Sequence, residues 1–310
     1  MPPAGGVYIL AMAHRAWVAD TVGARTFAQL ASELGGSELQ SLLIDVMQAR
    51  ASARDAKDLV AQYRRDPFCR PAAVDQRAML AIDAQLLAAA DRFDAIELSP
   101  VAPLGSCSIV GPTHQNRVLS ALRSSEVVSD PTNVLALECA QRLRDDPAAE
   151  VHLATSHRVL RAQPVPKLPG HAQHFRLFAL ASAGVERRNH AFTLAAVALH
   201  VRTLLDAFTR LERDGHALGR RRVQILSTPE RRGLGEQLAR TLEAEHQPLA
   251  HAYYSGGLRY RIWATVPEGE ELPLADGGTF DWLQQLAANR RAVFVASGLG
   301  SQLIALRCRP

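Results

Sequence analysis

The sequence predicts an α+β protein, in which an antiparallel sheet is flanked by helices and preceded by an N-terminal helical unit. Three observations support this. Short segments that alternate polar and apolar residues recur after residue 90, two of them face each other across a proline-rich loop, and the segments between them repeat apolar residues at helical spacing. Strands that follow hairpins, with helices packed to one side, favour this class over a doubly wound parallel sheet.

Composition indicates a soluble globular chain. It has 310 residues, of which 47% are apolar, and a formal net charge of +4 that does not by itself indicate nucleic acid binding. The four cysteines include no Cys-x-x-Cys pair, which favours a reducing, cytoplasmic location. No apolar span near twenty residues is evident and no signal peptide is supported, so we expect no membrane association.

The first residues differ from the rest of the chain. "TFAQLASEL", "SELQSLLIDVMQARAS" and "ARDAKDLVAQYRRD" repeat apolar residues at helical spacing. We therefore predict a helical unit over residues 1–72, whose function the sequence leaves open, and a core domain over residues 73–310.

The core domain begins with a helix from about Val74 to Ala90, and further helices and strands follow. We predict strands at "FDAIELSPVAPLG", "EVVSD", "RRVQILS", "GGLRYRIWATV" and "RAVFVASG", and helices at about 133–145, 190–213, 234–246 and 279–288.

A hairpin is predicted between residues 156 and 181. Its flanks, 157–162 and 174–180, alternate as half-buried strands do, and Pro164, Pro166 and Pro169 exclude the middle from a strand ladder. Arg161 and Arg176 would lie near the long loop, where two guanidinium groups suit a phosphate or a carboxylate. The alternative is a solvated hairpin edge with surface arginines.

The order of these segments resembles the catalytic core of class II aminoacyl-tRNA synthetases. "FDAIELSPVAPL" resembles their motif 1, "RVLRAQ…HFRLF" their motif 2, and "FVASGLGSQLIAL" lies where motif 3 would close the fold. "EVVSDPTNVLALECAQRL", "AYYSGGLRYRI" and "DGGTFDWLQQL" are similar to three segments of the histidyl enzymes. The resemblance covers residues 80 to 306 and implies a dimer formed through motif 1.

Four positions depart from the pattern of the histidyl enzymes. Gln163 replaces the motif 2 glutamate, and Ser301-Gln302 lies where motif 3 carries an arginine. Leu249 and Thr279 align with two further arginines of that family. Because a neutral amide cannot neutralise a phosphate, the resemblance implies a weakened ATP site.

The segments that would hold an amino acid match the family better. Asp130 and Thr132 match the carboxylate and hydroxyl that face the substrate's ammonium group. The side-chain pocket is matched by Tyr253, Tyr254, Ser255 and Gly256. With Arg161, Gln163 and Arg176 of motif 2, these residues form the predicted ligand site. Alternatively, Asp130 only caps a helix and the tyrosines belong to the core.

No metal site is predicted, because no cluster of histidine, cysteine and carboxylate residues is evident. Three functions remain open. The first is a non-charging histidyl-tRNA synthetase-like paralogue that binds an amino acid or related small molecule, as a regulatory or partner subunit similar in plan to the regulatory subunit of ATP phosphoribosyltransferase. The second is an adenylate-forming ligase acting on a non-tRNA acceptor, which would need ATP and Mg²⁺.

The third function, tRNA charging, ranks last. The sequence stops within ten residues of motif 3, which leaves no room for the anticodon-binding domain that the histidyl enzymes carry. We therefore expect a homodimer with a possible partner enzyme and without tRNA as a partner.

Overall fold

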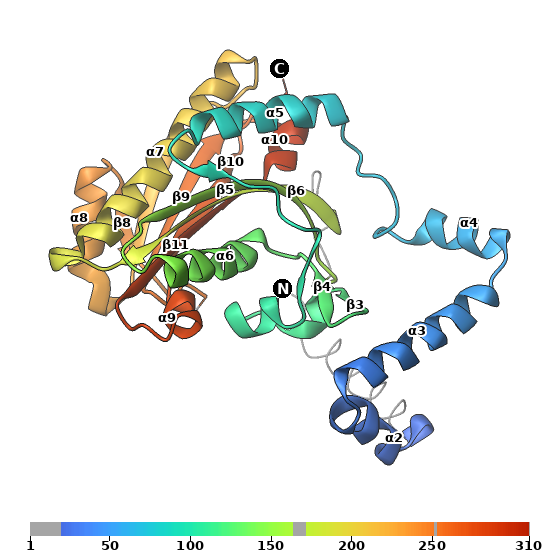
Figure 1. Ribbon diagram of the computed structural model, residues 1–310. Helices are drawn as coiled ribbons and strands as arrows, with labels where there is room; N and C mark the ends of the chain where they lie inside the picture. The colour runs from blue at the N-terminus through green and yellow to red at the C-terminus, as the bar shows by residue number, and fades with distance from the viewer. Residues whose placement is uncertain (1–19, 164–171, 251–252, 310) are drawn as a thin grey trace. The chain divides into compact units, whose positions relative to one another are not determined.

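The computed structural model describes residues 20–163, 172–250 and 253–309 of the chain (Figure 1). The chain divides into two compact units, with a boundary between Gln62 and Tyr63 and with residues 122–124 assigned to the first unit. The sequence places the boundary at 72/73, about ten residues later. Pro164, Pro166 and Pro169 of the predicted hairpin loop lie outside the described residues.

The first unit is helical, as its apolar spacing predicts. It contains α2 (Ala24–Ala28), a π-helical turn at Gln29–Glu33 and α3 (Gly36–Ser52), and α4 (Ala56–Arg65) runs across the boundary. None of the residues in these helices is buried, so they form no core of their own within the described residues.

The second unit is built on an eight-stranded sheet. Across the sheet the strands are β1 (Asp94–Ala95), β5 (Val151–Leu160), β6 (His174–Val185), β11 (Ala292–Leu299), β10 (Glu271–Phe280), β9 (Leu258–Thr265), β7 (Arg221–Ser227) and β8 (Glu245–Pro248). The outermost pair on each edge is parallel and the inner pairs are antiparallel. The predicted α+β class with an antiparallel sheet flanked by helices is confirmed.

Helices cover both faces of this sheet, although the sequence indicated one side (Figure 1). One face packs against α5 (Gln76–Ala89), α7 (Ala191–Arg213), α8 (Arg232–Thr241) and α10 (Ser301–Arg307), and the other against α6 (Pro131–Asp145) and α9 (Trp282–Leu286). The reason is visible in β6, where Phe178 and Leu180 enter the first core and Ala179 and Ala181 the second. A strand that is apolar on both faces needs a cover on each.

The predicted hairpin is confirmed as the β5–β6 pair. Leu160 pairs with His174 and Val151 with Ala183, and Arg161 N donates to the Gln173 carbonyl at 2.8 Å. The strands extend beyond their predicted bounds because alanines and small polar residues continue the buried pattern toward the sheet centre.

Three strands were missed in the sequence: β3 (Ser120–Ala121), β8 and β10. The β10 segment, "ELPLADGGTF", contains proline and a glycine pair and reads as a loop, and the first two residues of β8 fall in the helix predicted at 234–246. The glycines are needed for close packing: a Cβ at Gly277 would lie 2.4 Å from Ser297 Oγ, and one at Gly278 would lie 2.2 Å from the Leu258 carbonyl oxygen. Strand glycines of this kind mark a close backbone approach.

A three-stranded sheet leads into α6. It has the order β2 (Val101–Pro103), β4 (Ser125–Val127) and β3 (Ser120–Ala121). Glu126 is buried there and accepts hydrogen bonds from the backbone N–H groups of Gly105 and Cys107, each at 2.8 Å. Because β4 ends only three residues before Asp130, this buried carboxylate fixes the approach of the chain to the start of α6.

Helix α7 is the longest helix of this unit. The segment Arg188–Arg213 is long and apolar enough to cross a membrane by length and composition, a feature that the sequence reading overlooked. The most apolar 18-residue stretch of this helix is 61% buried inside the fold. Phe192, Val201 and Phe208 are among the buried residues of α7. These contacts with the sheet are those of a core helix.

Candidate functional site

A cavity of about 710 Å³ lies on the α6 face of the eight-stranded sheet. Its walls come from the end of β5, from β6, β9, β10 and β11, and from the first turn of α6. It brings together six of the predicted site residues: Asp130, Thr132, Arg161, Gln163, Tyr253 and Tyr254.

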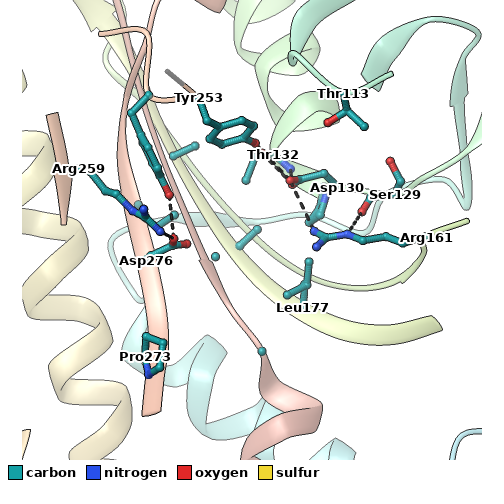
Figure 2. Close-up of a pocket in the computed structure, with 18 of the residues that line it drawn as sticks. Thr113, Ser129, Asp130, Thr132, Arg161, Leu177, Tyr253, Arg259, Pro273 and Asp276 are labelled. Atoms are coloured by element: carbon teal, nitrogen blue, oxygen red, sulfur yellow. Dashed lines mark hydrogen bonds and ion pairs between the residues drawn. The ribbon is translucent and has the colours of Figure 1, made fainter. Parts of the chain in front are cut away.

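Asp130 is both a helix cap and part of the cavity wall (Figure 2). Its Oδ1 accepts from Thr132 N at 3.0 Å and from Thr132 Oγ1 at 2.7 Å, so this oxygen is used by the first turn of α6. Its Oδ2 lies 3.5 Å from the hydroxyl of Tyr253, which donates to it, and 3.8 Å from Nη2 of Arg161. The two alternatives that the sequence left open for Asp130 are therefore not exclusive.

Arg161 is held by its backbone and aromatic contacts. Its Nε donates to the Ser129 carbonyl at 3.0 Å, and its guanidinium carbon lies 5.1 Å from the centre of the Phe175 ring. Both contacts fix the guanidinium plane, and its terminal nitrogens face Asp130 and the cavity (Figure 2). A pre-oriented guanidinium of this kind binds carboxylates and phosphates through paired N–H groups.

Tyr253 belongs to an aromatic cluster beside Asp130. Its ring centre lies 5.3 Å from that of Tyr254, 5.4 Å from that of Phe280 and 5.9 Å from that of Trp282, in edge-to-face geometry. Burial is the main reason that its pKa is raised well above the ordinary value, and the Asp130 carboxylate adds to the shift. The Tyr253 hydroxyl therefore stays protonated and acts as a hydrogen-bond donor at neutral pH.

The opposite wall carries a second charged group, which the sequence reading missed (Figure 2). Nη2 of Arg259 lies 2.6 Å from Oδ2 of Asp276, and the Tyr254 hydroxyl donates to the same oxygen at 2.8 Å. The Arg259 guanidinium also stacks 4.8 Å from the centre of the Tyr254 ring. Burial, followed by the nearby Asp276 charge, raises the pKa of Tyr254, so this hydroxyl also remains a donor.

Arg261 and Trp263 continue the same wall along β9. The signal that could have revealed it is the alternation in "LRYRIWA": Leu258, Tyr260 and Ile262 are buried in the α7-side core, so Arg259, Arg261 and Trp263 must face the other side. The quoted match "AYYSGGLRYRI" includes Arg259 and Arg261, but the resemblance assigned a role only to the tyrosine pair and the Ser-Gly that follows it.

Three predicted site residues lie outside this cavity. Arg176 lies two and four positions before Phe178 and Leu180 on β6, so its side chain points to the same face as theirs, away from this cavity. There it forms an ion pair with the buried Asp83 of α5. Ser255 bonds to Asp281, accepting from its N–H at 3.0 Å, and Gly256 lines a different cavity. Arg161 and Arg176 therefore lie on opposite faces of the sheet, and the prediction that they share one anion is wrong.

The positions that align with arginines of the histidyl enzymes carry neutral side chains. The Gln302 residue is 3% exposed and its amide oxygen accepts from Arg158 at 3.3 Å, while Leu249 is buried in the α6-side core. Thr279 accepts from the Leu258 N–H at 3.2 Å. Of the positions that depart from that family's pattern, only Gln163 lines the cavity, and its amide carries no charge.

The described residues contain no group of three or more histidine, cysteine, aspartate or glutamate side chains that could hold a metal ion. Cys107 lines the cavity, accepts from Ser129 Oγ at 3.0 Å, and has a raised pKa, chiefly because of burial. A thiol in this state is a poor nucleophile.

The fold defined by these strands and helices is that of the catalytic core of class II aminoacyl-tRNA synthetases. The chain is similar to an ATP phosphoribosyltransferase regulatory subunit/histidyl-tRNA synthetase from Bacillus halodurans (15% identity, 78% of this chain and 82% of that chain, TM-score 0.56). It is also similar to a histidine–tRNA ligase subunit from Alicyclobacillus acidocaldarius (13%, 78% and 96%, TM-score 0.55).

A threonyl-tRNA synthetase domain from Cryptosporidium parvum, described as an RNA-binding domain, gives a TM-score of 0.58 at 10% identity over 77% of this chain and 64% of that chain. No protein-family model and no curated protein matches the sequence. At these identities the similarity establishes the fold, and the choice among members of the class depends on the site residues.

Proposed function

We propose that this chain is a non-charging relative of the histidyl-tRNA synthetase core, which binds an amino acid or a related small molecule as a regulatory or partner subunit. The observation that carries the proposal is the arrangement at Asp130. One carboxylate oxygen is used by the helix cap, and the other faces the cavity between Tyr253 and Arg161. An ammonium group placed there gains a charge-assisted hydrogen bond beside an aromatic wall.

The charges of the cavity favour a ligand that also carries acidic groups. Four arginines and two aspartates line it, a formal excess of two positive charges. Asp276 is paired with Arg259, and Arg261 lies on the same wall, where its guanidinium carbon is 6.0 Å from the centre of the Trp263 ring. An amino acid would place its carboxylate on Arg161 or Arg261, and an additional acidic group would use the remaining arginine.

Loss of tRNA charging is part of the proposal. Amino-acid activation develops negative charge on the α-phosphate of ATP, and preorganised cations stabilise that charge. Gln302 and Leu249 present no cation to the cavity, and Gln163 presents a neutral amide. The adenylate-forming ligase remains the competing function, and it requires activation chemistry that can be measured directly.

A role beside other subunits is supported by the description of the Bacillus halodurans relative, which names a regulatory subunit. We extend that role to this chain as a proposal and expect a homodimer that associates with a partner enzyme. Ligand binding near α6 would then be the regulatory input.

The proposal is tested by a thermal-shift screen of the full chain against the twenty amino acids and their acidic and phosphorylated derivatives. A ligand that binds only the native state raises the melting temperature by mass action. We expect at least one amine-bearing ligand to stabilise the protein and the Asp130→Asn variant to lose that response. If no amine-bearing compound shifts the melting temperature at millimolar concentration, the proposed function is wrong.

A further inference from the structure

A second cavity, of about 450 Å³, lies at the end of β10 and the start of β11. Leu258 and Thr279 line the second cavity, whereas Arg259 and Asp276, one and three positions away on the same strands, line the first. Because successive side chains of a strand point to opposite faces, Leu258 and Thr279 face α7. Phe280, at the end of β10, lines both cavities. Five arginines line the second cavity: Arg187, Arg188, Arg231, Arg290 and Arg291.

Sheet topology brings four of these arginines together. β6 and β11 pair antiparallel, with Val185 opposite Ala292, and Glu186 N donates to the Arg291 carbonyl at 2.8 Å. The end of β6 and the start of β11 therefore lie side by side. Two sequence doublets, 187–188 and 290–291, which are about a hundred residues apart, become neighbours at one edge of the cavity.

Arg231 approaches from another direction, at the junction between the 3₁₀ turn Pro229–Arg231 and α8. A Cβ at Gly257 would lie 2.8 Å from its Cγ, and Gly257 has a φ of +81°. Only glycine combines that backbone conformation with the space for the arginine. The Gly256–Gly257 segment, which resembles part of an amino-acid pocket, here makes room for a cation of the second cavity.

The single acidic residue in the lining is already used. Glu186 Oε1 accepts from the backbone N–H groups of Arg187, Phe192 and Thr193, and its Oε2 accepts from Thr193 Oγ1 and lies 3.4 Å from His190 Nδ1. These bonds lower the pKa of the carboxyl, although burial opposes them. The carboxylate is directed to the first turn of α7 and does not neutralise the arginines.

Most of the guanidinium groups have no acidic partner. Arg187 pairs with Glu150 at 3.2 Å, and Arg291 Nη2 donates to the Glu186 carbonyl at 3.2 Å. Within the described ranges, the side chains of Arg188, Arg231 and Arg290 form no hydrogen bond or ion pair. Like charges gathered around one concave surface repel one another and create a positive potential that an anion relieves.

We propose that this second cavity is a binding site for a compact anion that carries more than one phosphate group, such as a pyrophosphate or the polyphosphate part of a small molecule. Guanidinium groups from three segments can each bind phosphate oxygens through paired N–H donors. The lining favours a small ligand over single-stranded nucleic acid, because its one phenylalanine, Phe280, is 5% exposed and it contains no tyrosine or tryptophan on which bases could stack.

The test measures binding of inorganic pyrophosphate to the full-length protein by titration calorimetry at 50 mM salt. We expect binding that weakens as the salt concentration rises. The double variant Arg188→Gln/Arg290→Gln removes two exposed, unpaired cations and should weaken binding at least tenfold, with an unchanged circular dichroism spectrum. Arg231→Gln, from the other wall, should weaken it independently.

Arg213→Gln is the matched control. Arg213 is also exposed, and it ends α7, about 33 Å from the cavity at 1.5 Å per residue. We expect its affinity to stay within about twofold of wild type, as the distance exceeds the screening length. Arg261→Gln shows which cavity binds pyrophosphate, because Arg261 lines the first cavity and not the second. Its affinity for pyrophosphate should equal that of the wild type.

Three results would overturn the proposal: no pyrophosphate binding at millimolar concentration, equal affinity in wild type and the double variant, or a loss confined to Arg261→Gln. Binding of an RNA hairpin without binding of pyrophosphate would also overturn it and would assign the surface to nucleic acid. The proposal does not depend on a ligand in the first cavity, so it can fail or succeed separately.

Discussion

Oδ2 of Asp130 lies 3.8 Å from Nη2 of Arg161, while Oδ1 of the same carboxylate is bonded to Thr132. The carboxylate thus serves two purposes with two different oxygens. Oδ1 caps helix α6, and Oδ2 forms a loose ion pair with Arg161. The Arg161 guanidinium is itself oriented by Ser129 and Phe175. This separation of roles makes the site testable by substitution.

Replacing Asp130 by asparagine keeps an oxygen for the helix cap and removes the charge. The free energy of unfolding should change by less than about 1 kcal/mol, because asparagine and aspartate cap helices about equally well. Affinity for an amine-bearing ligand should fall by ~1.5–3 kcal/mol, the worth of a charged hydrogen bond. Denaturant unfolding and calorimetry measure the two effects. Asp130→Ala should lower both the stability and the affinity for the ligand. Equal affinity in the wild type, Asp130→Asn and Asp130→Ala would contradict the assignment of Asp130 as the ammonium-binding residue.

Activation chemistry should be absent. Loss of one preorganised charge costs about a hundred- to a thousandfold in rate, and more than one such position is neutral here. We expect no amino-acid-dependent exchange of pyrophosphate into ATP with any standard amino acid. An authentic histidyl-tRNA synthetase under the same conditions is the positive control. Exchange above background with even one amino acid would place the ligase function first.

The Arg259–Asp276 pair should stabilise the fold as well as shape the cavity. The Arg259 side chain is 13% exposed, so Asp276→Asn leaves a mostly buried guanidinium without its charged partner. We expect a loss of about 1–3 kcal/mol in the free energy of unfolding. Tyr254→Phe removes only a neutral donor to the same carboxylate and should cost about 0.5–1.5 kcal/mol. Urea denaturation measures the free energy of unfolding of both variants. If Asp276→Asn loses no more of it than Tyr254→Phe does, the ion pair has no structural role.

Stability should decrease at acidic pH through His200. This histidine is fully buried between Ser182 and Ser297, and burial lowers its pKa to about 3. The unfolded chain binds a proton near pH 6.5, whereas the folded chain does not, so this contribution is complete above pH 6.5 and is lost progressively as the pH falls toward 3. In this range the free energy of unfolding should fall by about 1.4 kcal/mol per pH unit for each such histidine.

Unfolding curves between pH 7 and pH 4.5 measure this slope, to which His152 and His157 add, since burial lowers their pKa values as well. His200→Gln can keep hydrogen bonds to the serines but cannot titrate. Its slope should be smaller than that of wild type by about one proton, and an identical slope in both proteins would exclude His200 as the cause.

The protein should form a two-fold dimer. The apolar residues of α5 differ in exposure: Ile82 and Leu86 are fully buried, whereas Leu80 is 58% and Leu87 36% exposed. Light scattering at micromolar concentration should give a dimer, and Leu80→Glu should weaken it. Leu59→Glu, at a leucine that is 55% exposed on α4, is the control. A monomeric wild type would contradict the prediction.

Sequence patterns predicted the fold where burial is periodic. Strand β9 alternates buried and half-buried residues along its whole length, and α7 repeats apolar residues at helical spacing. β10 escaped prediction because its glycines exist for close contact with neighbouring strands, an interaction that spacing along the chain does not reveal.

Site prediction was limited by strand parity. Asp130, Thr132, Arg161, Gln163 and the tyrosine pair line one cavity, whereas Arg176 lies on the opposite face because an odd number of positions separates it from the lining residue Leu177. The hairpin loop hides this parity, since its length does not fix which residues of the two strands are opposite each other.

Strand β10 contributes to both cavities, with Asp276 on one face and Thr279 on the other. Inserting or deleting one residue before them would exchange the two faces and move each side chain into the wrong cavity. Divergence among descendants of this chain is therefore expected to proceed by substitution at positions such as 259, 261 and 276, with the length between Pro273 and Phe280 held constant. Loops outside this stretch are free of that constraint and can vary in length.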